Sequence, residues 1–484
     1  MRDDKPCRSR LTEKEHGHDP PGLCSCMANR LPFEIWLHIK GFLDPTESEW
    51  LYSINSAWFQ MVMDDRYRVL DLTLIDSRVL ARLPVLRDPD ISKRVRHLCI
   101  SVAALERAEV RLIMEIIPTL SNVSECSVVW NFRGTQEAAA HALEATILPA
   151  VWATCGATLK KLDISAQASR LNKVLASNVY FSQLETFSLE LLRQSESESI
   201  VAEAASLFFP RVNPRLTTLS IHCRRALDPS SVLNQLQLFS RLQSLTLVSY
   251  PSELKDPSGL ETFFAHCASH LCHLKLSLSH SALSSKERGI NTLHMANAHI
   301  PLLETLEIAF GCPDTRDTLS LIPSELHSLF DGARTTLHRL VLEEIALNLE
   351  DLRALTSVLV GCDGLRSLTV SVAEFTAAHI DIIARNSHMI SALGVVYVFT
   401  AQEKHQFEAD LSLQSSTYNH WKLREISIWR WKRTVDHSRW DLVQPFATCI
   451  PTIETFFGMP VPRPGQSSRN SIVPRMLEAL ELVG

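Results

Sequence analysis

The residues whose types and spacing could bind a metal ion lie together in HCASHLCH, residues 266–273. This stretch holds three histidines and two cysteines within eight positions. His266 and His270 are four residues apart, so on a helix both would lie on one face, as zinc ligands do. Zinc binding is therefore the first chemistry to test against the rest of the chain.

A buried structural role explains the same cluster without a metal. Cys267 lies four residues before the first leucine of a segment that recurs along the chain, and Cys155 and Cys449 occupy the same place in two other copies. Three cysteines at one repeat position indicate a small buried slot where a helix meets a strand. His270 falls at a turn position that other copies fill with Thr158, Thr336 and Thr452. We favour the structural interpretation and predict neither a metal site nor a cofactor.

Groups suited to other chemistry are sparse. The histidines and cysteines of residues 16–26 have no ordinary zinc spacing, and we predict a disordered tail over residues 1–28. No GxGxxG, GxxxxGK[ST], GxSxG or HExxH motif occurs, although phosphate loops and nucleophile elbows need such glycines. Asp64 and Asp65 are adjacent, so on a helix their side chains diverge by about 100° and cannot pair as acid and base. The sequence therefore predicts a non-catalytic protein.

Composition limits the classes of partner. The formal net charge of -6 argues against a nucleic-acid binder, which normally presents a basic face. No apolar run approaches the ~18 residues of a membrane span, and the charged start MRDDKPCRSR has no apolar segment behind it. The twelve cysteines are mostly isolated, which favours reduced thiols. We expect a cytoplasmic or nuclear protein that binds neither nucleic acid nor membrane.

One pattern, apolar-x-x-apolar-x-apolar, organises most of the chain. It recurs thirteen times, at intervals of 25 to 36 residues. The fourth residues of the copies are Leu98, Cys126, Leu162, Phe187, Leu219, Leu245, Leu274, Leu306, Leu340, Leu368, Leu393, Ile426 and Phe456. A period near 30 residues, held this often, indicates a solenoid.

Each repeat unit alternates apolar residues at period two and then shows a helical stretch, such as residues 229–240 and 350–362. Strand then helix, repeated, places parallel strands on the inside of a curved stack and helices outside. The pattern resembles the leucine-rich repeat family over roughly residues 69–457. The asparagine or cysteine that the family usually places after each strand is present only as Asn131, so the array is degenerate. The predicted fold class is α/β.

The residues between the strand leucines are expected to face the concave side. They are mostly small and polar with mixed charge, for example Lys161, Asp163 and Ser165 in one copy and Ser367, Thr369 and Ser371 in another. Such a surface suits protein recognition. The stretch WRWKR adds Trp429, Arg430 and Trp431, residue types that dominate interface hot spots. These three could bind a target, but we favour tryptophans that pack under the terminal loop and the helix around residues 440–447.

A separate helical module precedes the repeats. LPFEIWLHIKGFL, residues 31–43, predicts a helix with Pro32 in its first turn. Further helices are predicted from about Glu47 and over residues 57–67, and then Leu70, Leu72 and Leu74 alternate as a capping strand. The apolar arc of the first helix is about twice the ~100° stripe of an ordinary surface helix. One face should pack on Leu51, Ile54, Trp58 and Met61, and the other should be an interaction surface.

This module resembles the F-box. The residues that carry the resemblance are Leu31, Pro32, Glu34, Ile35, Leu43, Asp44, Ser53, Asn55 and Trp58. The resemblance implies a surface for the Skp-type adaptor of cullin-based ubiquitin ligases. Carried over residue by residue, the adaptor contacts would be Leu31, Pro32, Ile35 and Leu43. An F-box followed by leucine-rich repeats is similar to the substrate receptors of these SCF-type ligases, most of all to the fungal sets, and implies a protein target for the repeats.

The predicted organisation is therefore a tail over 1–28, an F-box over 29–68, a solenoid over 69–457 and a C-terminal tail over 458–484. A rival reading is a leucine-rich-repeat interaction scaffold whose F-box-like helices only cap the solenoid, since an apolar solenoid end needs covering. Burial separates the two readings. A cap would bury Leu31, Ile35 and Leu43 against residues 51–75, whereas a receptor would leave several of them exposed.

Overall fold

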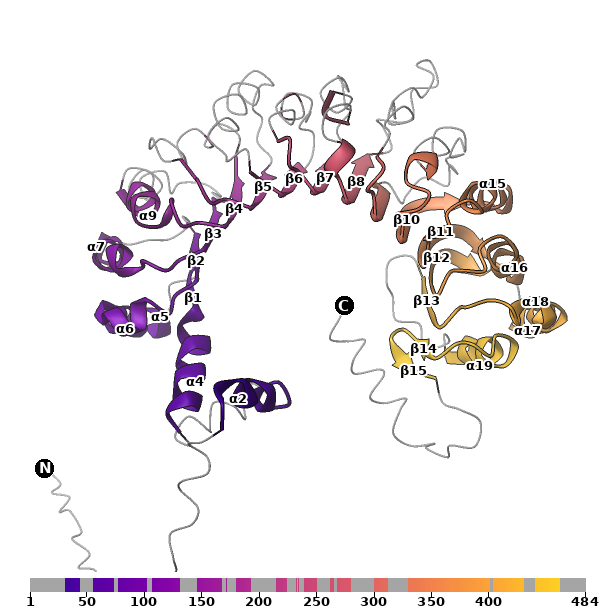
Figure 1. The fold of residues 1–484 in the computed structure, drawn as a ribbon, viewed down its shortest axis with the longest axis horizontal. Helices are drawn as coiled ribbons and strands as arrows, with labels where there is room; N and C mark the ends of the chain where they lie inside the picture. Colours follow the sequence, from indigo (N-terminus) through magenta and orange to yellow (C-terminus); the bar gives the residue numbers. More distant parts are fainter. Residues whose placement is uncertain are drawn as a thin grey trace, which may run out of the picture.

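A single sheet runs as an arc through the described part of the chain, with helices on its outer side (Figure 1). The computed structural model describes residues 31–43, 55–73, 77–101, 107–130, 146–167, 171, 180–192, 215–223, 232, 234, 239–249, 262–264, 268–279, 300–311, 330–400, 404–430 and 440–461. The predicted tail over 1–28, Asn131 and residues 462–484 lie outside these ranges. Their assignments stay predictions.

Among the described residues the sheet has 15 strands, and each pairs with its neighbours in sequence. The strands are β1 (Val69–Leu72), β2 (His97–Ser101), β3 (Glu125–Val129), β4 (Lys161–Ala166), β5 (Thr186–Leu191), β6 (Thr218–Cys223), β7 (Ser244–Ser249), β8 (His273–Ser279), β9 (Thr305–Gly311), β10 (Arg339–Leu347), β11 (Ser367–Phe375), β12 (Ala392–Thr400), β13 (Glu425–Arg430), β14 (Thr455–Phe456) and β15 (Met459–Pro460). Strands β1 to β14 pair in parallel, and β15 folds back antiparallel on β14. The chain is thus an α/β solenoid of the leucine-rich-repeat type, as the period predicts.

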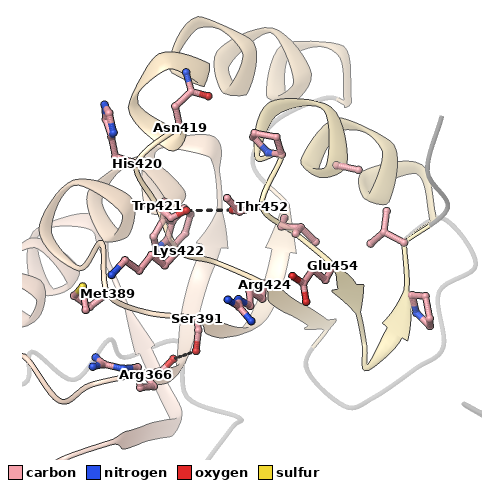
Figure 2. A pocket seen from close by; sticks show the side chains of 15 residues that line it. Arg366, Met389, Ser391, Asn419, His420, Trp421, Lys422, Arg424, Thr452 and Glu454 are labelled. Carbon is pink, nitrogen blue, oxygen red and sulfur yellow. Dashed lines mark hydrogen bonds between the residues drawn. The ribbon is translucent and has the colours of Figure 1, made fainter.

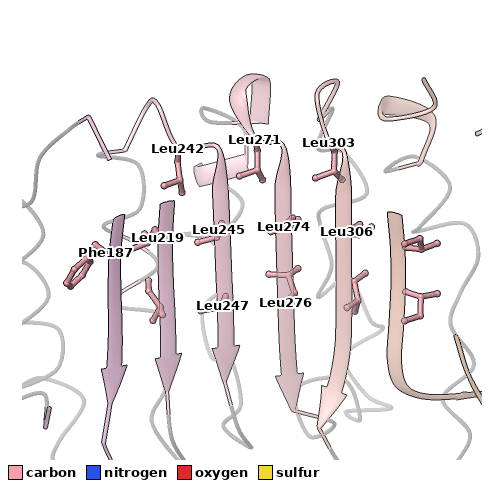
Figure 3. Packing of buried hydrophobic residues seen from close by; sticks show 14 of the residues in the cluster. Phe187, Leu219, Leu242, Leu245, Leu247, Leu271, Leu274, Leu276, Leu303 and Leu306 are labelled. Atoms are coloured by element: carbon pink, nitrogen blue, oxygen red, sulfur yellow. The ribbon is translucent and has the colours of Figure 1, made fainter. Parts of the chain in front are cut away.

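The thirteen predicted ladder residues lie side by side across the sheet. Leu98 pairs with Cys126, Cys126 with Leu162, and the register continues unbroken to Ile426 and Phe456. Leu70 of β1 adds a further member at the N-terminal end. All thirteen side chains are at most 2% exposed, and Figure 3 shows the central ones stacked behind their strands. Apolar burial along this ladder is the main stabilising contact between units.

The outer layer consists of short helices that cover the buried face of the sheet (Figure 1). They are α5 (Ser77–Arg82), η1 (Leu83–Arg87), α6 (Pro89–Ser92), α7 (Arg107–Ile116), η2 (Ile117–Thr119), α9 (Leu148–Cys155), η6 (Ala268–His270), α15 (Leu349–Leu359), α16 (Ala377–Asn386), α17 (Lys404–Leu413), α18 (Ser415–Tyr418) and α19 (Trp440–Cys449). Helix α15 confirms the helix predicted over 350–362. The stretch 229–240 lies mostly outside the described residues.

In three units a turn threonine binds to the unit before it. Thr158 donates its hydroxyl to the carbonyl of Val123 at 3.2 Å, and Thr336 donates to the carbonyl of Leu303 at 3.0 Å. Thr452 does the same to Trp421 at 3.1 Å. These bonds satisfy carbonyls at the turns, where the helix-to-strand geometry leaves them without a ladder partner. The repeat position that His270 shares therefore has a structural use.

The array ends in a tight hairpin. Phe457 and Gly458 both have positive φ, 54° and 74°, as a two-residue connection between antiparallel strands requires. The sheet thereby continues through Met459 and Pro460, past residue 457 where the sequence placed the end of the solenoid. Pro460 lacks an N–H and lies on the last strand, which disfavours addition of a further strand there.

Lowering the pH is expected to destabilise the unit around α16. Burial lowers the pKa of His379 from 6.5 to about 4, and its Nδ1 accepts the backbone N–H of Thr376 at 3.3 Å. Because the unfolded state binds the proton first, this stabilisation is present above pH 6.5 and is lost as the pH falls toward 4, by about 3 kcal/mol in full. Urea unfolding of wild type and His379→Gln, which keeps an acceptor for the cap, should show the steeper acid loss in wild type; parallel curves would contradict it.

Candidate functional site

The N-terminal module has a small aromatic core of its own. Helix α2 (Phe33–Lys40) packs on α4 (Ser56–Arg68) through Trp36 and Trp58. Their ring centroids lie 5.8 Å apart at 82°, an edge-to-face pair. Met61 completes this core, and Ile39 and Leu43 pack against it with partial burial. Trp58 and Met61 were predicted for this inner face; Leu51, Ile54 and the helix predicted from Glu47 lie outside the described residues.

Helix α4 fixes the module to the first repeat units. Asn55 caps the helix by accepting the N–H of Trp58 at 2.7 Å, and at its other end α4 runs directly into β1. Asp64 pairs with Arg94, which follows α6, whereas Asp65 pairs with Lys40 of α2. The two carboxylates therefore diverge, as the sequence predicts for adjacent helical residues. In Figure 1, α4 continues from β1 beyond the first strand, and α2 lies beside α4.

Helix α2 and the residues next to it also carry apolar side chains that are exposed among the described residues. The exposed fractions are 45% for Ile35 and 47% for Leu37 in the helix, and 78% for Phe42 just after it. Leu31 and Phe33 are exposed to a similar degree. At 100° per residue, Phe33 and Leu37 lie on one side of the Trp36 contact and Ile35 lies on the other. We call these five exposed residues together the outer face of α2; exposed apolar side chains gathered on one short segment are typical of interaction sites.

The predicted adaptor contacts divide between the two faces. Leu31, Pro32 and Ile35 are exposed on the outer face, whereas Leu43 is partly buried against the Trp36 cluster. Sequence reasoning left Phe33, Leu37 and Phe42 out of the site, although the helical wheel placed all three within the apolar arc. Exposure of Leu31 and Ile35 is the outcome expected of a receptor, not of a cap.

The histidine and cysteine cluster takes the form of ordinary repeat structure where it is described. His270 is exposed, and its Nδ1 lies 2.8 Å from the hydroxyl of Ser269. His266 and Cys267 are outside the described residues. Within the ranges that are described, no three His, Cys, Asp or Glu side chains are grouped so as to hold a metal, and no helix has the length and apolarity to cross a membrane.

Cysteines at the shared repeat position fill the buried slot that the sequence predicts. Cys155 and Cys449 are 1% and 5% exposed, and the Cys155 thiol donates to the carbonyl of Val151 at 3.0 Å. Both side chains belong to the main core. A thiol in this environment acts as a small apolar group.

Cys155 is expected to resist alkylation in the folded chain. Burial raises its pKa to about 12, and only the thiolate reacts, so at about pH 8 its rate should fall about a thousandfold below that of an ordinary cysteine. A short iodoacetamide pulse with and without urea, read by peptide mass spectrometry, measures this. Equal labelling of Cys155 in both samples would contradict the assigned burial.

The concave face carries the polar ladders predicted for it. Between β2 and β4, Ser127 donates to Asp163 at 3.1 Å and lies 3.0 Å from the ring of His97. Between β8 and β10, Glu307 pairs with Lys275 at 2.9 Å and with Arg339 at 3.6 Å. These side chains are half-buried or exposed and carry both charges. The arrangement suits recognition of a protein surface better than enclosure of a small apolar ligand.

Trp429 lies at the C-terminal end of this concave face. Its ring packs edge-on against Phe457 of the terminal hairpin at 5.8 Å and lies close over Gly394, where an added Cβ would approach the ring to 3.0 Å. Packing under the terminal loop is the reading that the sequence favours for this tryptophan. The side chain of Arg430 and all of Trp431 lie outside what the structure describes, so a target-binding role for the three stays untested.

Comparison with known proteins finds similarity to solved structures alone. No protein-family model matches the chain, and no curated protein is similar to it in sequence. Among solved structures, a chain of the yeast Rad7 and Elc1 complex aligns with 76% of this chain and 88% of its own length, at 15% identity and a TM-score of 0.44. The leucine-rich repeat-containing protein LegL7 from Legionella pneumophila aligns over 63% and 93%, at 15% identity and a TM-score of 0.37.

Proposed function

We propose that the chain is the substrate-recognition adaptor of a cullin-based SCF ubiquitin ligase. Residues 29–68 act as an F-box that docks on a Skp-type adaptor, and the repeats from residue 69 onward bind a target protein. The chain itself contributes no reacting group. It raises the rate of ubiquitin transfer by holding target and donor close together, in the cytoplasm or nucleus.

The outer face of α2 is the observation that carries this proposal. Burial of a Leu, Ile or Phe side chain contributes roughly 1.5–3 kcal/mol, and this face offers five such residues that no described part of the chain covers. The core of Trp36, Trp58 and Met61 already stabilises α2 from the other side. A helix held through one face, with exposed apolar side chains at both margins of that face, is suited to docking on a partner.

A leucine-rich-repeat scaffold with a purely capping module is the second candidate. The contacts of Arg94 with α4 and the continuity of α4 with β1 support a capping role for that helix. They do not extend to α2, whose outer face has no capping partner among the described residues. The capping interpretation therefore explains the position of α4 but not the exposed apolar residues of α2.

Binding of purified full-length chain to a purified Skp-type adaptor tests the proposal. Co-elution on size exclusion and a heat of binding in calorimetry are the expected results, followed by recruitment of the cullin subunit by the adaptor-bound chain. Absence of binding to the adaptor by well-folded chain would overturn the ligase role and leave the scaffold.

A further inference from the structure

A cleft opens at the edge of the sheet where strands β11 to β14 begin. Its volume is about 1290 Å³. Figure 2 shows side chains from four consecutive units around it. We call it the C-terminal cleft and define it by Arg366, Met389, Ser391, Lys422, Arg424 and Glu454.

The C-terminal cleft lies where repeat units of unequal length are adjacent. The unit from Leu368 to Leu393 has 25 residues, whereas the next, to Ile426, has 33. The short unit contributes Met389 and Ser391 to this edge. The hydroxyl of Ser391 donates to the carbonyl of Arg366 at 3.2 Å, which ties the short unit to the unit before it. The longer unit builds the wall around buried Trp421, whose carbonyl accepts from Thr452 of the last unit.

The charges at the cleft are unbalanced. Arg366, Lys422 and Arg424 are exposed, and none has a carboxylate within 4.0 Å among the described residues. Some cations elsewhere on the described surface do have a carboxylate partner: Arg87 pairs with Glu115 at 2.5 Å and Lys275 with Glu307 at 2.9 Å. Glu454 is the single acidic residue of the lining. In a chain of net charge -6, three unpaired cations around one cleft provide a local attraction for anions.

Hydrogen bonds hold one of these cations at the rim. The guanidinium of Arg366 donates to the carbonyls of Asp363 and Leu365 at 2.7 and 3.2 Å. Carbonyl acceptors leave its charge uncompensated, so it remains available to an incoming anion. Met389, Ala447 and Pro451 supply apolar surface between the charged groups. The cleft is therefore both cationic and apolar along its length.

We propose that the C-terminal cleft binds an acidic peptide segment, one in which carboxylate or phosphate groups alternate with apolar residues. The volume exceeds what a free inorganic anion fills, and the apolar lining would be unused by one. A nucleic-acid backbone calls for a longer basic face than three residues supply. The site lies at the opposite end of the array from the outer face of α2 (Figure 1), so its occupancy does not depend on the adaptor.

Three short fluorescein-labelled peptides test the proposal. They share one apolar framework and carry glutamate, phosphoserine or glutamine at the alternating positions. Fluorescence anisotropy with the full chain should show the glutamate or phosphoserine peptide binding at least about tenfold more tightly than the glutamine peptide, with affinity falling as salt rises. Whichever of the glutamate and phosphoserine peptides binds more tightly identifies carboxylate or phosphate as the preferred group. Equal affinity of all three peptides would overturn the proposal.

Charge variants locate the binding. The double variant Lys422→Glu/Arg424→Glu changes only exposed side chains and should weaken the preferred peptide by about tenfold or more, whereas Glu454→Gln should strengthen it by a few-fold. Arg353→Glu is the control matched to the single variant Lys422→Glu, because each reverses one charge and Arg353 is exposed on α15, outside the cleft. Equal loss in Arg353→Glu and Lys422→Glu, or equal competition by a single-stranded oligonucleotide, would assign the binding to general charge attraction and overturn the proposal.

Discussion

Replacing Ile35 by lysine is expected to abolish binding of the Skp-type adaptor without lowering the thermal stability of the chain. Ile35 belongs to the outer face of α2 and is 45% exposed, so the free chain tolerates a charge there. In the complex, the ammonium would be buried among apolar side chains without a partner, which costs several kcal/mol. Affinity should fall at least about a hundredfold, as calorimetry with purified adaptor would measure.

Two further variants make this result specific. Val360→Lys places the same charge on another exposed aliphatic residue, 59% exposed at the end of α15, and should leave adaptor binding unchanged. Leu31→Ala/Pro32→Ala trims the edge of the outer face and should weaken binding less than Ile35→Lys does. If Ile35→Lys and Val360→Lys lower affinity equally, or if Ile35→Lys lowers the melting temperature by several degrees, the outer face is not the docking surface.

The repeat register was predictable because one physical requirement acts at every unit. Each strand must place an apolar side chain against its two neighbours, and a slip by one residue would turn that side chain to the concave face. The thirteen ladder residues chosen from sequence are therefore the residues that pair, from Leu98 to Phe456. Even the unusual members Cys126 and Phe187 keep the register.

The sequence predicts that α2 has more apolar surface than one contact can bury, but it does not predict which residues are buried. Periodicity shows that the apolar arc is too wide for one contact, but Ile35 and Trp36, about 100° apart on the wheel, both lie within that arc. Which of them turns inward depends on Trp58, which lies on another helix and meets Trp36 edge to face. The same partner draws Leu43 toward the inner cluster, so it lies apart from the other predicted adaptor contacts.

The terminal hairpin and the C-terminal cleft could not be predicted from the sequence, because both depend on differences between neighbouring repeat units. The final motif IETFFG looks like a weak copy of the repeat, yet Phe457 takes a left-handed conformation and turns the chain back as β15. That turn brings its ring to Trp429. The C-terminal cleft likewise depends on a short unit lying beside a long one, and a list of intervals does not show which edge of the sheet becomes hollow.

The Phe187→Ala substitution is expected to lower the free energy of unfolding of its part of the solenoid by about 3–5 kcal/mol. Phe187 is 0% exposed and pairs in register with Leu162 and Leu219. The substitution leaves a cavity between two units, whereas Phe187→Leu restores the residue that most of the ladder uses and should cost less than about 1.5 kcal/mol. Urea unfolding of the three proteins compares these losses.

The loss of stability caused by Phe187→Ala should also be local, because a unit in a solenoid contacts only its neighbours. Amide hydrogen exchange in Phe187→Ala should accelerate in β4, β5 and β6 and stay close to wild type in β10 to β13. Uniform acceleration along the whole sheet would show that the array unfolds as one cooperative block. A cost below about 1 kcal/mol for Phe187→Ala, or an equal cost for Phe187→Leu, would mean that packing along the ladder is not what holds adjacent units together.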